Sequence, residues 1–321
     1  MPLLALENVT RRYPVARGVL RLHAAAVQAV SSVSLAVERG EVLGLVGESG
    51  CGKSTLARLI LGLEPLDGGT IRFQDRPLPD WDEKDLRRRV QMVFQDPYSS
   101  LNPRRTVGST VAEPLVIHGV GSRAGRRARV AELLALVGLD AEHARRYPHE
   151  FSGGQRQRVA IARALALGPE LVVCDEPVSA LDVSIRAQVL NLLAELRERL
   201  RLTYLFISHD LSVVGHVSDR VAVMYLGRIV ELAASRELFS RPRHPYTQAL
   251  LSAAPEPDPE APCERIRLAG DVPSPLAPPA GCPFHPRCPQ AFTPCATRRP
   301  ELSLLADGRR VACWLHDDAR R

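Results

Sequence analysis

The chain has 321 residues, of which 45% are hydrophobic and 24% charged, which is the composition of a folded globular protein. It is long enough for one large domain and a smaller addition. Its apolar runs are shorter than the roughly 18 to 20 residues of a membrane-spanning helix, so we expect no membrane span. Met1 to Asn8 show no signal-peptide pattern, which predicts a cytosolic protein.

The formal charge of +6 would suit a nucleic-acid partner. However, all but two of the 42 Lys and Arg residues are arginine, the exceptions being Lys53 and Lys84. The arginines are spread along the chain, apart from a group at Arg123 to Arg129. This distribution is typical of a codon bias, so we expect no nucleic-acid partner.

The first 240 residues alternate short apolar runs with helical patterns, which predicts an α/β core. Between Gly108 and Leu139 the apolar residues recur at helical spacing, which predicts a helical insertion. Gly227-Arg228 separates two apolar runs and predicts a hairpin turn. The expected strands are Val42 to Val46, Val90 to Phe94, Leu171 to Cys174, Thr203 to Ser208, Val221 to Leu226 and Ile229 to Leu232.

Residues Gly47 to Thr55, GESGCGKST, match the phosphate-loop pattern G-x-x-x-x-G-K-[ST], between an expected strand and an expected helix at Thr55 to Leu63. Backbone amides of such a loop surround the β-phosphate, and the helix N-terminus adds a favourable dipole. Lys53 would neutralise phosphate oxygens and the Ser54 hydroxyl would bind Mg²⁺. The predicted nucleotide-binding residues are Gly47, Ser49, Gly50, Cys51, Gly52, Lys53, Ser54 and Thr55.

Two carboxylates, Asp175 and Glu176, follow the apolar run Leu171 to Cys174. Polar residues at the carboxyl ends of such strands lie where α/β proteins bind ligands. We predict that Asp175 holds the magnesium through water, and that Glu176 accepts a proton from the attacking water or polarises it.

The run Phe151-Ser152-Gly153-Gly154-Gln155, before an expected helix at Arg156 to Leu167, resembles the signature of ABC-type ATPases. The resemblance implies an α/β phosphate-loop core with a mixed sheet, an antiparallel β subdomain and a helical subdomain. It also implies a head-to-tail dimer, in which Ser152, Gly153, Gly154 and Gln155 of one chain face the ATP on the phosphate loop of the other.

Four further residues match the family in the expected order. Gln95 resembles the glutamine that reaches magnesium and the attacking water, and His209 the switch histidine at the γ-phosphate. Asp182, in Ser179-Ala180-Leu181-Asp182, resembles the segment that crosses the dimer interface. Tyr13 stands where the family stacks an aromatic ring on adenine.

The loop Gln95 to Arg104, the run His244 to Leu251 and the tail Gly281 to Cys288 resemble the peptide-importer branch of this family, including its dipeptide, oligopeptide and nickel members. Lys53 to Arg58 and the tail look most like the F-type ATPase subunit. This implies a motor subunit at the cytoplasmic face of the inner or plasma membrane. Its implied partners are permease subunits and a paralogous ATPase or a second copy, with a periplasmic or lipid-anchored solute-binding protein acting indirectly. Import of nickel or another small solute, or a soluble ATPase acting on nucleic acid, are the alternatives.

These patterns predict three parts. They are a nucleotide-binding domain at 1–254 with a helical subdomain at about 96–158, a proline-rich connector at 255–280, and a cysteine-rich extension at 281–321.

The extension holds four of the seven cysteines, namely Cys282, Cys288, Cys295 and Cys313. In a cytosolic protein such a group more often binds metal than forms disulfides. The tight C-x2-4-C pairs of structural zinc sites are absent, and the resemblance implies a [4Fe–4S] cluster. Zinc and free thiols are the alternatives.

Overall fold

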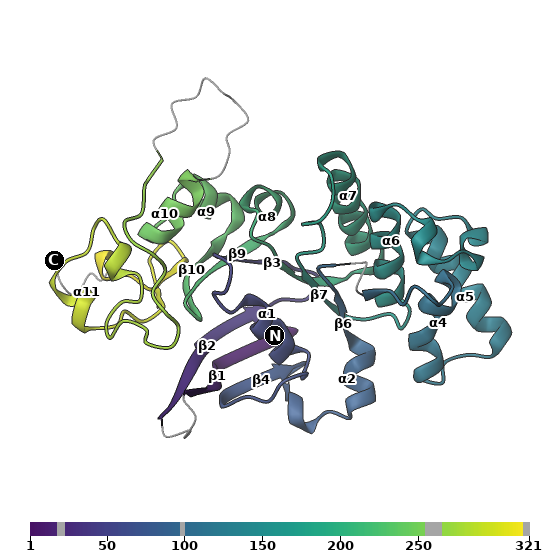
Figure 1. The fold of residues 1–321 in the computed structure, drawn as a ribbon, viewed down its shortest axis with the longest axis horizontal. Helices are drawn as coiled ribbons and strands as arrows, with labels where there is room; N and C mark the ends of the chain where they lie inside the picture. Colours follow the sequence, from purple (N-terminus) through teal and green to yellow (C-terminus); the bar gives the residue numbers. More distant parts are fainter. Residues whose placement is uncertain (18–22, 97–99, 254–264, 317–321) are drawn as a thin grey trace. The chain divides into compact units, whose positions relative to one another are not determined.

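The computed structural model describes residues 1–17, 23–96, 100–253 and 265–316 (Figure 1). The chain divides into two compact units. We call Met1–Leu3, Val37–Val42 and Phe73–Ile207 the signature unit, and Leu4–Ala36, Leu43–Arg72 and Ser208–Arg321 the phosphate-loop unit. Parts of two predicted segments, 97–99 in the loop after Gln95 and 255–264 in the connector, lie outside the described residues, as does Cys263.

The signature unit contains three parallel strands in the order β8-β7-β6. All residues of β7 and β8 are buried, which explains their continuous apolar sequences, because a parallel strand packs on both faces. The strands predicted in these places are confirmed. Their bounds are Val90–Val93 for β6, Leu171–Asp175 for β7 and Thr203–Ile207 for β8.

The helical insertion of the signature unit is confirmed, with α4, α5 and α6 packed on one another (Figure 1). Each of these helices is preceded by a residue whose side-chain hydroxyl accepts a hydrogen bond from a backbone amide of the first turn. These residues are Thr106 for α4, Ser122 for α5 and Ser152 for α6. The helices of this unit are α2 (Glu83–Arg89), α4 (Val107–Ile117), α5 (Arg123–Leu136), α6 (Gly153–Ala164) and α7 (Val183–Leu200). Its short elements are β5 (Arg76–Pro77) and the 3₁₀ turns Leu78–Asp80, Ala141–Arg145 and Pro148–Glu150.

In the phosphate-loop unit, β3 pairs in parallel with β9, and β9 pairs antiparallel with β10. The predicted hairpin exists, but its turn lies one residue earlier than Gly227-Arg228. Tyr225 faces Arg228 in the ladder, so the turn is Leu226-Gly227, and both residues have positive φ, 44° and 77°. The bounds are Val42–Val46 for β3, Arg220–Tyr225 for β9 and Arg228–Ala234 for β10.

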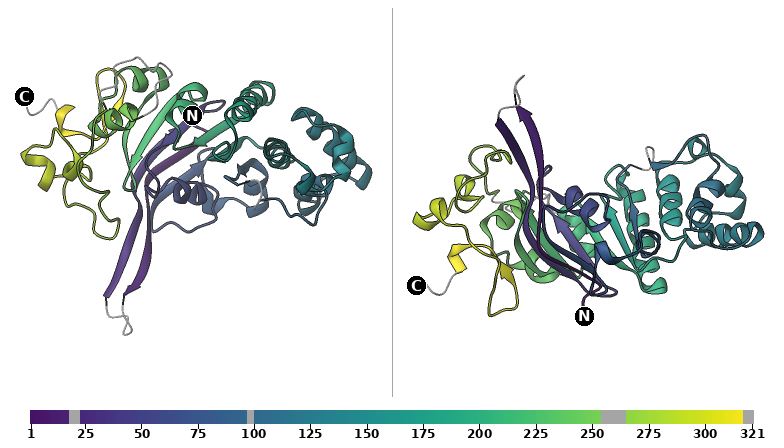
Figure 2. Two further views of the ribbon diagram at one scale, coloured as in Figure 1. Left: turned by 45° about the horizontal axis from the view of Figure 1, so that its top comes forward. Right: turned by 90° about the horizontal axis from the view of Figure 1, so that it is seen from below.

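A second sheet in this unit has β1 between β2 and β4. Figure 2 shows β1 and β2 as long strands that run side by side in both views. The bounds are Leu4–Arg17 for β1, His23–Val37 for β2 and Gly68–Phe73 for β4. The helices of the unit are α1 (Lys53–Ile60), α8 (Leu211–Val217), α9 (Ser235–Ser240), α10 (Pro245–Ser252) and α11 (Thr293–Thr297).

The cysteine-rich extension is part of the phosphate-loop unit. Its strand β12 (Arg310–Val311) pairs antiparallel with β10, and β11 (Ser303–Leu304) pairs with β12. The extension therefore continues the sheet that contains β9 and β10. Its remaining elements are the 3₁₀ turns η4 (His285–Arg287) and η5 (Trp314–His316).

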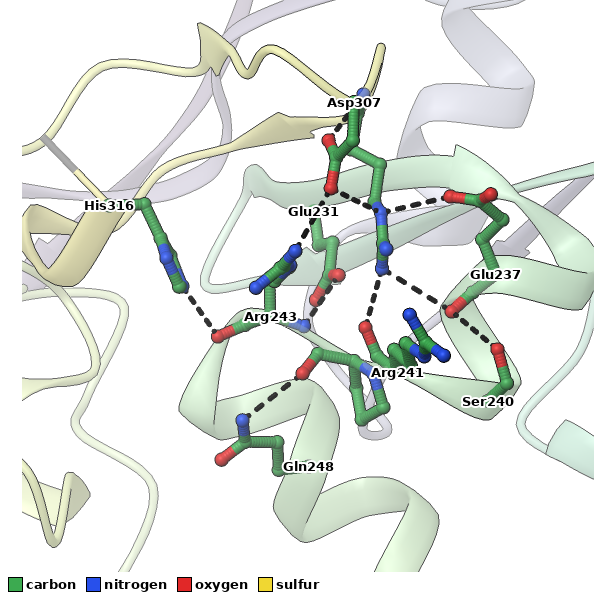
Figure 3. Close-up of polar contacts among 10 residues, drawn as sticks. Glu231, Glu237, Ser240, Arg241, Arg243, Gln248, Asp307 and His316 are labelled. Carbon is green, nitrogen blue, oxygen red and sulfur yellow. Dashed lines mark hydrogen bonds and ion pairs between the residues drawn. The ribbon is translucent and has the colours of Figure 1, made fainter. Parts of the chain in front are cut away.

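A polar network also fastens the extension to α9 and the segment after it (Figure 3). Nε of the buried Arg309 lies 3.1 Å from both a Glu237 and an Asp307 carboxylate oxygen, and its Nη1 donates to the carbonyl of Arg241 at 2.5 Å. The Arg243 guanidinium pairs with Asp307 at 3.1 Å. Such pairing offsets the cost of burying the Arg309 charge.

No helix in the described ranges is both long and apolar enough to cross a bilayer. The sheets and helices together confirm the expected α/β class, with a mixed sheet, a second β sheet and a helical part.

Candidate ATP site and cysteine-rich extension

The phosphate loop connects the buried strand β3 to helix α1, which begins at Lys53, two residues earlier than predicted. Two of its glycines are required by close backbone contacts. A Cβ on Gly47, whose φ is 155°, would lie 2.2 Å from the Met224 carbonyl oxygen. A Cβ on Gly52, at φ 110°, would lie 2.1 Å from the Ala29 carbonyl oxygen. The close approach of these carbonyl oxygens therefore requires glycine at both positions of the loop.

The Lys53 side chain is buried, with 6% exposure. Its ammonium donates to the carbonyl oxygens of Gly47 at 2.7 Å and Glu48 at 3.0 Å. These bonds fix the ammonium beside the first two residues of the loop. Ser49 and Ser54 are exposed and Cys51 is buried, so Cys51 could serve a nucleotide only through its backbone.

His209 lies in the same unit as the phosphate loop. The residue before it, Ser208, donates its backbone amide to the carbonyl of Leu45 in β3 at 3.2 Å. His209 therefore follows a segment adjacent to the strand that leads into the loop. Its side chain is exposed, and Asp210 caps helix α8 directly after it.

Tyr13, on β1, is half-buried. The Arg11 guanidinium lies 4.8 Å from the centre of its ring, and the Tyr13 hydroxyl donates to the Glu64 carboxylate. Arg11 and Glu64 thus fix the orientation of the Tyr13 ring. A ring that stacks on a base needs such a fixed orientation.

In the signature unit, the register of β6 and β7 brings Gln95 and Glu176 together. Val93 faces Cys174 in the parallel ladder, and each site residue lies two positions further along its own chain. The Gln95 Nε2 donates to the Glu176 Oε2 at 2.9 Å. Two residues predicted from separate motifs are therefore hydrogen-bonded neighbours.

Glu176 has a φ of 49°, in the left-handed region that non-glycine residues rarely adopt. Its backbone amide donates to the carbonyl of Ile207, at the end of β8, at 2.9 Å. Left-handed backbone at a polar position is typical of active sites, where surrounding structure compensates for the strain. Asp175, directly before it, closes β7 and is buried, with 8% exposure.

The signature residues form the start of α6. The Ser152 Oγ accepts the Gln155 amide at 3.3 Å, while the Gln155 Oε1 accepts the Ser152 amide at 3.0 Å. A Cβ on Gly154 would lie 2.3 Å from Ile185 Cγ2 in α7, so Gly154 allows α6 and α7 to approach closely. Ser152 is exposed, and so is Asp182, which precedes α7.

The predicted site residues are therefore divided between the units. The phosphate-loop unit holds the loop itself, Tyr13, His209 and the four cysteines. The signature unit holds Gln95, Asp175, Glu176, Asp182 and Ser152 to Gln155.

The cysteines of the extension, Cys282, Cys288, Cys295 and Cys313, all line one small cavity together with His244 and His285. Burial, with a further contribution from the neighbouring thiols, raises the pKa of Cys282 to about 11 and that of Cys313 to about 12. Among the described residues, no three His, Cys, Asp or Glu side chains are arranged to hold one metal ion.

Sequence reasoning missed a contact between the extension and the phosphate loop. The Arg287 guanidinium makes a bidentate ion pair with the Glu48 carboxylate, the shortest N–O distance being 2.9 Å. The Tyr246 hydroxyl accepts the backbone amide of Glu48 at 3.0 Å. Both partners lie in runs that resemble the peptide-importer branch, but no local pattern indicates that they meet Glu48.

A glycine-dependent phosphate loop with a buried lysine defines a phosphate-loop nucleotide-binding protein. The family comparisons are more specific. Residues 30–179 match the model described as "ABC transporter" and residues 230–295 the model described as "Oligopeptide/dipeptide transporter, C-terminal region". The chain belongs to the ABC transporter ATP-binding family, in the branch with this C-terminal region, and it is an ATPase.

Similar proteins match over almost their whole length. The chain is 51% identical to the dipeptide transport ATP-binding protein DppF of Escherichia coli over 319 residues, 98% of this chain and 95% of that protein. It is also 51% identical to the oligopeptide transport ATP-binding protein AppF of Bacillus subtilis over 320 residues, 98% and 97% of the two chains.

Solved structures share the ATPase part of the fold. A dimeric post-hydrolysis state of the ATP-binding cassette MJ0796, bound to ADP and Pi, matches with a TM-score of 0.63 and 30% identity, covering 73% of this chain and 99% of that one. The structure of cbiO1 from Clostridium perfringens, part of the transporter complex cbiONQ, matches with a TM-score of 0.65 and 29% identity, covering 75% and 91%.

Proposed function

We propose that the chain is the ATP-hydrolysing motor subunit of an ABC importer for dipeptides or oligopeptides. One observation carries the proposal: the similarity to peptide-transport ATP-binding proteins extends over 98% of the chain and includes the C-terminal region named for these transporters. Import of nickel or another small solute is the alternative within this branch. A soluble ATPase acting on nucleic acid is disfavoured by the same full-length match.

The proposed chemistry relies on positioning and charge neutralisation, as phosphoryl transfer generally does. Backbone amides of the loop and the Lys53 ammonium bind the phosphates, while Ser54, Asp175 and Gln95 are the proposed magnesium-binding residues. The hydroxyl, carboxylate and amide oxygens of these side chains suit this hard cation. Magnesium, when bound, supplies positive charge to the β- and γ-phosphates.

Glu176 is the proposed general base for the attacking water. Its hydrogen bond with Gln95 supports this assignment, because an amide donor at 2.9 Å fixes the direction in which the carboxylate points. His209 is the proposed contact of the γ-phosphate, and Tyr13 the proposed platform for adenine.

The ATP site is proposed to be completed by a second chain, through its Ser152, Gly153, Gly154, Gln155 and Asp182. Exposure of Ser152 and Asp182 supports this role, since residues that serve a partner's nucleotide must reach the surface. A similar cassette was solved as a dimer with ADP and Pi. The second chain is proposed to be a paralogous ATPase or another copy of this one.

The proposed location is the cytoplasmic face of the inner or plasma membrane, where the motor docks on permease subunits and works with a separate solute-binding protein. We retain the proposed boundaries of 1–254 for the nucleotide-binding domain, 255–280 for the connector and 281–321 for the extension. Purification of the transporter from membranes through a tag on this chain tests the assembly. Permease subunits should accompany the chain, whereas DNA-stimulated turnover without them would favour the soluble alternative.

For the four cysteines we propose a [4Fe–4S] cluster, with zinc or free thiols as alternatives. A tetrahedral zinc ion needs four thiolates within about 2.3 Å of one point, whereas a cluster binds each thiolate at a separate iron and accepts wider spacing. The four thiols line one small cavity, so all three alternatives concern the same residues. Anaerobically purified protein should then absorb at about 400 nm and contain iron; a colourless sample with zinc would exclude it.

A further inference from the structure

Glu48, the second residue of the phosphate loop, is hydrogen-bonded to two residues of the C-terminal part of the chain, Arg287 and Tyr246. Its carboxylate receives both terminal nitrogens of Arg287, at 2.9 to 3.2 Å. Its backbone amide donates to the Tyr246 hydroxyl at 3.0 Å. One loop residue is thus fixed through its side chain and through its backbone by residues about 200 and 240 positions later.

The neighbours of Tyr246 and Arg287 hold both side chains in place. Tyr246 is fully buried, and its ring packs against Tyr225 and Phe284, with centroids 4.6 and 5.4 Å away. Arg287 closes the turn η4, in which its amide donates to the Phe284 carbonyl at 3.0 Å, and it directly precedes Cys288. The aromatic cluster therefore positions the Tyr246 hydroxyl. The turn η4, directly before Cys288, positions the Arg287 guanidinium.

The Arg287–Glu48 pair is largely shielded from solvent, with side-chain exposures of 9% and 27%. Burial by itself lowers the pKa of Arg287, but the bonds to Glu48 outweigh it and raise the pKa above the usual arginine value. A pair in this setting is sensitive to the loss of one partner, because the remaining charge stays desolvated and uncompensated.

Glu48 is in turn connected to the lysine of the loop. Its carbonyl oxygen accepts the Lys53 ammonium at 3.0 Å. A displacement of Glu48 would therefore change one of the acceptors that hold Lys53. In addition, an unpaired Glu48 carboxylate would add a negative charge beside the site of the ATP phosphates.

We propose that Arg287 and Tyr246 are positioning residues for ATP binding, through which the C-terminal extension fixes the phosphate loop and neutralises Glu48. The inference rests on the proposed role of Lys53 and the loop in binding ATP. The extension is accordingly a structural part of the nucleotide site as well as an addition to the sheet. Such an effect acts on bound ATP and on the transition state alike, so it should change KM more than kcat.

The test is a double-mutant cycle on the full chain, with the dissociation constant of Mg-ATP measured by calorimetry and with ATPase kinetics of the assembled transporter. Arg287→Ala should weaken ATP binding about fivefold or more, with kcat at saturating ATP little changed. Adding Glu48→Gln to Arg287→Ala should recover part of the lost affinity, because the uncompensated carboxylate charge is gone while the ion pair that fixes the loop is still absent. A double variant as weak as the single one, or normal binding by Arg287→Ala, would overturn the proposal.

Tyr246→Phe removes only the hydroxyl and keeps the ring in the aromatic cluster, so it isolates the bond to the Glu48 amide. It should also weaken ATP binding while leaving the far-ultraviolet dichroism unchanged; unchanged affinity would remove Tyr246 from the proposal. Arg298→Ala is the matched control, since Arg298 is an exposed arginine of the same extension whose guanidinium lies 5.4 Å from the Trp314 ring. It should bind ATP normally.

Lys53→Ala separates failure of this inference from failure of the proposed function. If Lys53→Ala binds ATP normally, the loop is not the nucleotide site and both ideas fail. If only Lys53→Ala weakens binding while the Arg287 and Tyr246 variants do not, the proposed function stands and the positioning role is wrong. Arg287→Lys, which keeps the charge but not the bidentate geometry, should fall between wild type and Arg287→Ala.

Discussion

The amide nitrogen of Gln95 lies 2.9 Å from a carboxylate oxygen of Glu176, although the two residues are 81 positions apart. The pairing follows from the β6–β7 register, which aligns Val93 with Cys174. A water molecule activated by Glu176 would thus have a second polar group beside it. This relationship makes the chemistry of Glu176 the first point to test.

Glu176→Gln should bind Mg-ATP with near-normal affinity and lose at least about a hundredfold in ATP turnover, because the amide cannot accept the proton. Retained binding is expected since the phosphates are bound by other residues. Single-turnover hydrolysis and equilibrium binding measure the two effects. Substantial residual hydrolysis would assign the base to another residue.

Ser152→Arg should leave ATP binding by the isolated chain intact and abolish ATP-dependent pairing and turnover. Ser152 is exposed at the start of α6, so a large cation there would block the surface offered to a second nucleotide. Analytical ultracentrifugation with ATP, in an otherwise hydrolysis-deficient background, reports the pairing. Normal turnover by this variant would refute a site shared between two chains.

Gly47→Ala should destroy ATP binding. The added Cβ would lie 2.2 Å from the Met224 carbonyl oxygen, at a φ of 155°, so the loop must move. Gly40→Ala is the control, because Gly40 also has positive φ, 72°, but nothing lies within 4 Å of its Cβ position. It should lower stability slightly and bind ATP normally. Equal affinities in the two variants would mean that the shape of the loop is not needed.

His244 makes stability depend on pH. Burial first, then the neighbouring His316, lowers the pKa of His244 to about 3. The neutral ring accepts the Tyr246 amide at Nδ1, 3.0 Å away, while the backbone amide of His244 donates to Glu231. In the unfolded chain the pKa is about 6.5. The unfolded state therefore binds the extra proton first, and stability is full above pH 6.5 and falls as pH decreases.

Between pH 6.5 and 5, this residue should remove about 2 kcal/mol from the free energy of unfolding. His244→Asn keeps a side-chain acceptor for the start of α10 but does not titrate. Denaturant unfolding at the two pH values should show a smaller loss for the variant. An identical loss would assign the acid sensitivity to other groups.

The sequence was most informative where chemistry depends on contiguous residues. The phosphate loop, the strands β3, β7 and β8, and the helical insertion are all readable from local patterns. The errors were shifts at element ends. Helix α6 begins at Gly153 rather than Arg156, because the Ser152–Gln155 capping box starts the helix inside the signature. The hairpin turn includes Leu226, whose positive φ no propensity would favour.

Local sequence patterns do not predict contacts between segments that are far apart in the chain. The pairing of β12 with β10 aligns Val311 with Glu231, and two-residue strands carry too little periodicity to be recognised. The Glu48 contacts with Tyr246 and Arg287 also depend on the tertiary fold. Each residue by itself is an ordinary loop glutamate, helix tyrosine or tail arginine, and only their packing makes them neighbours.

Peptide uptake by the reconstituted transporter is the most direct test of the central claim. Vesicles would contain the complete transporter with either the wild-type chain or Glu176→Gln, together with ATP on the motor side and the solute-binding protein on the other. We predict that labelled di- or oligopeptide accumulates with the wild-type chain and not with Glu176→Gln. Uptake that is equal with both chains, or accumulation of nickel but not of peptide, would contradict a peptide importer driven by ATP hydrolysis at this site.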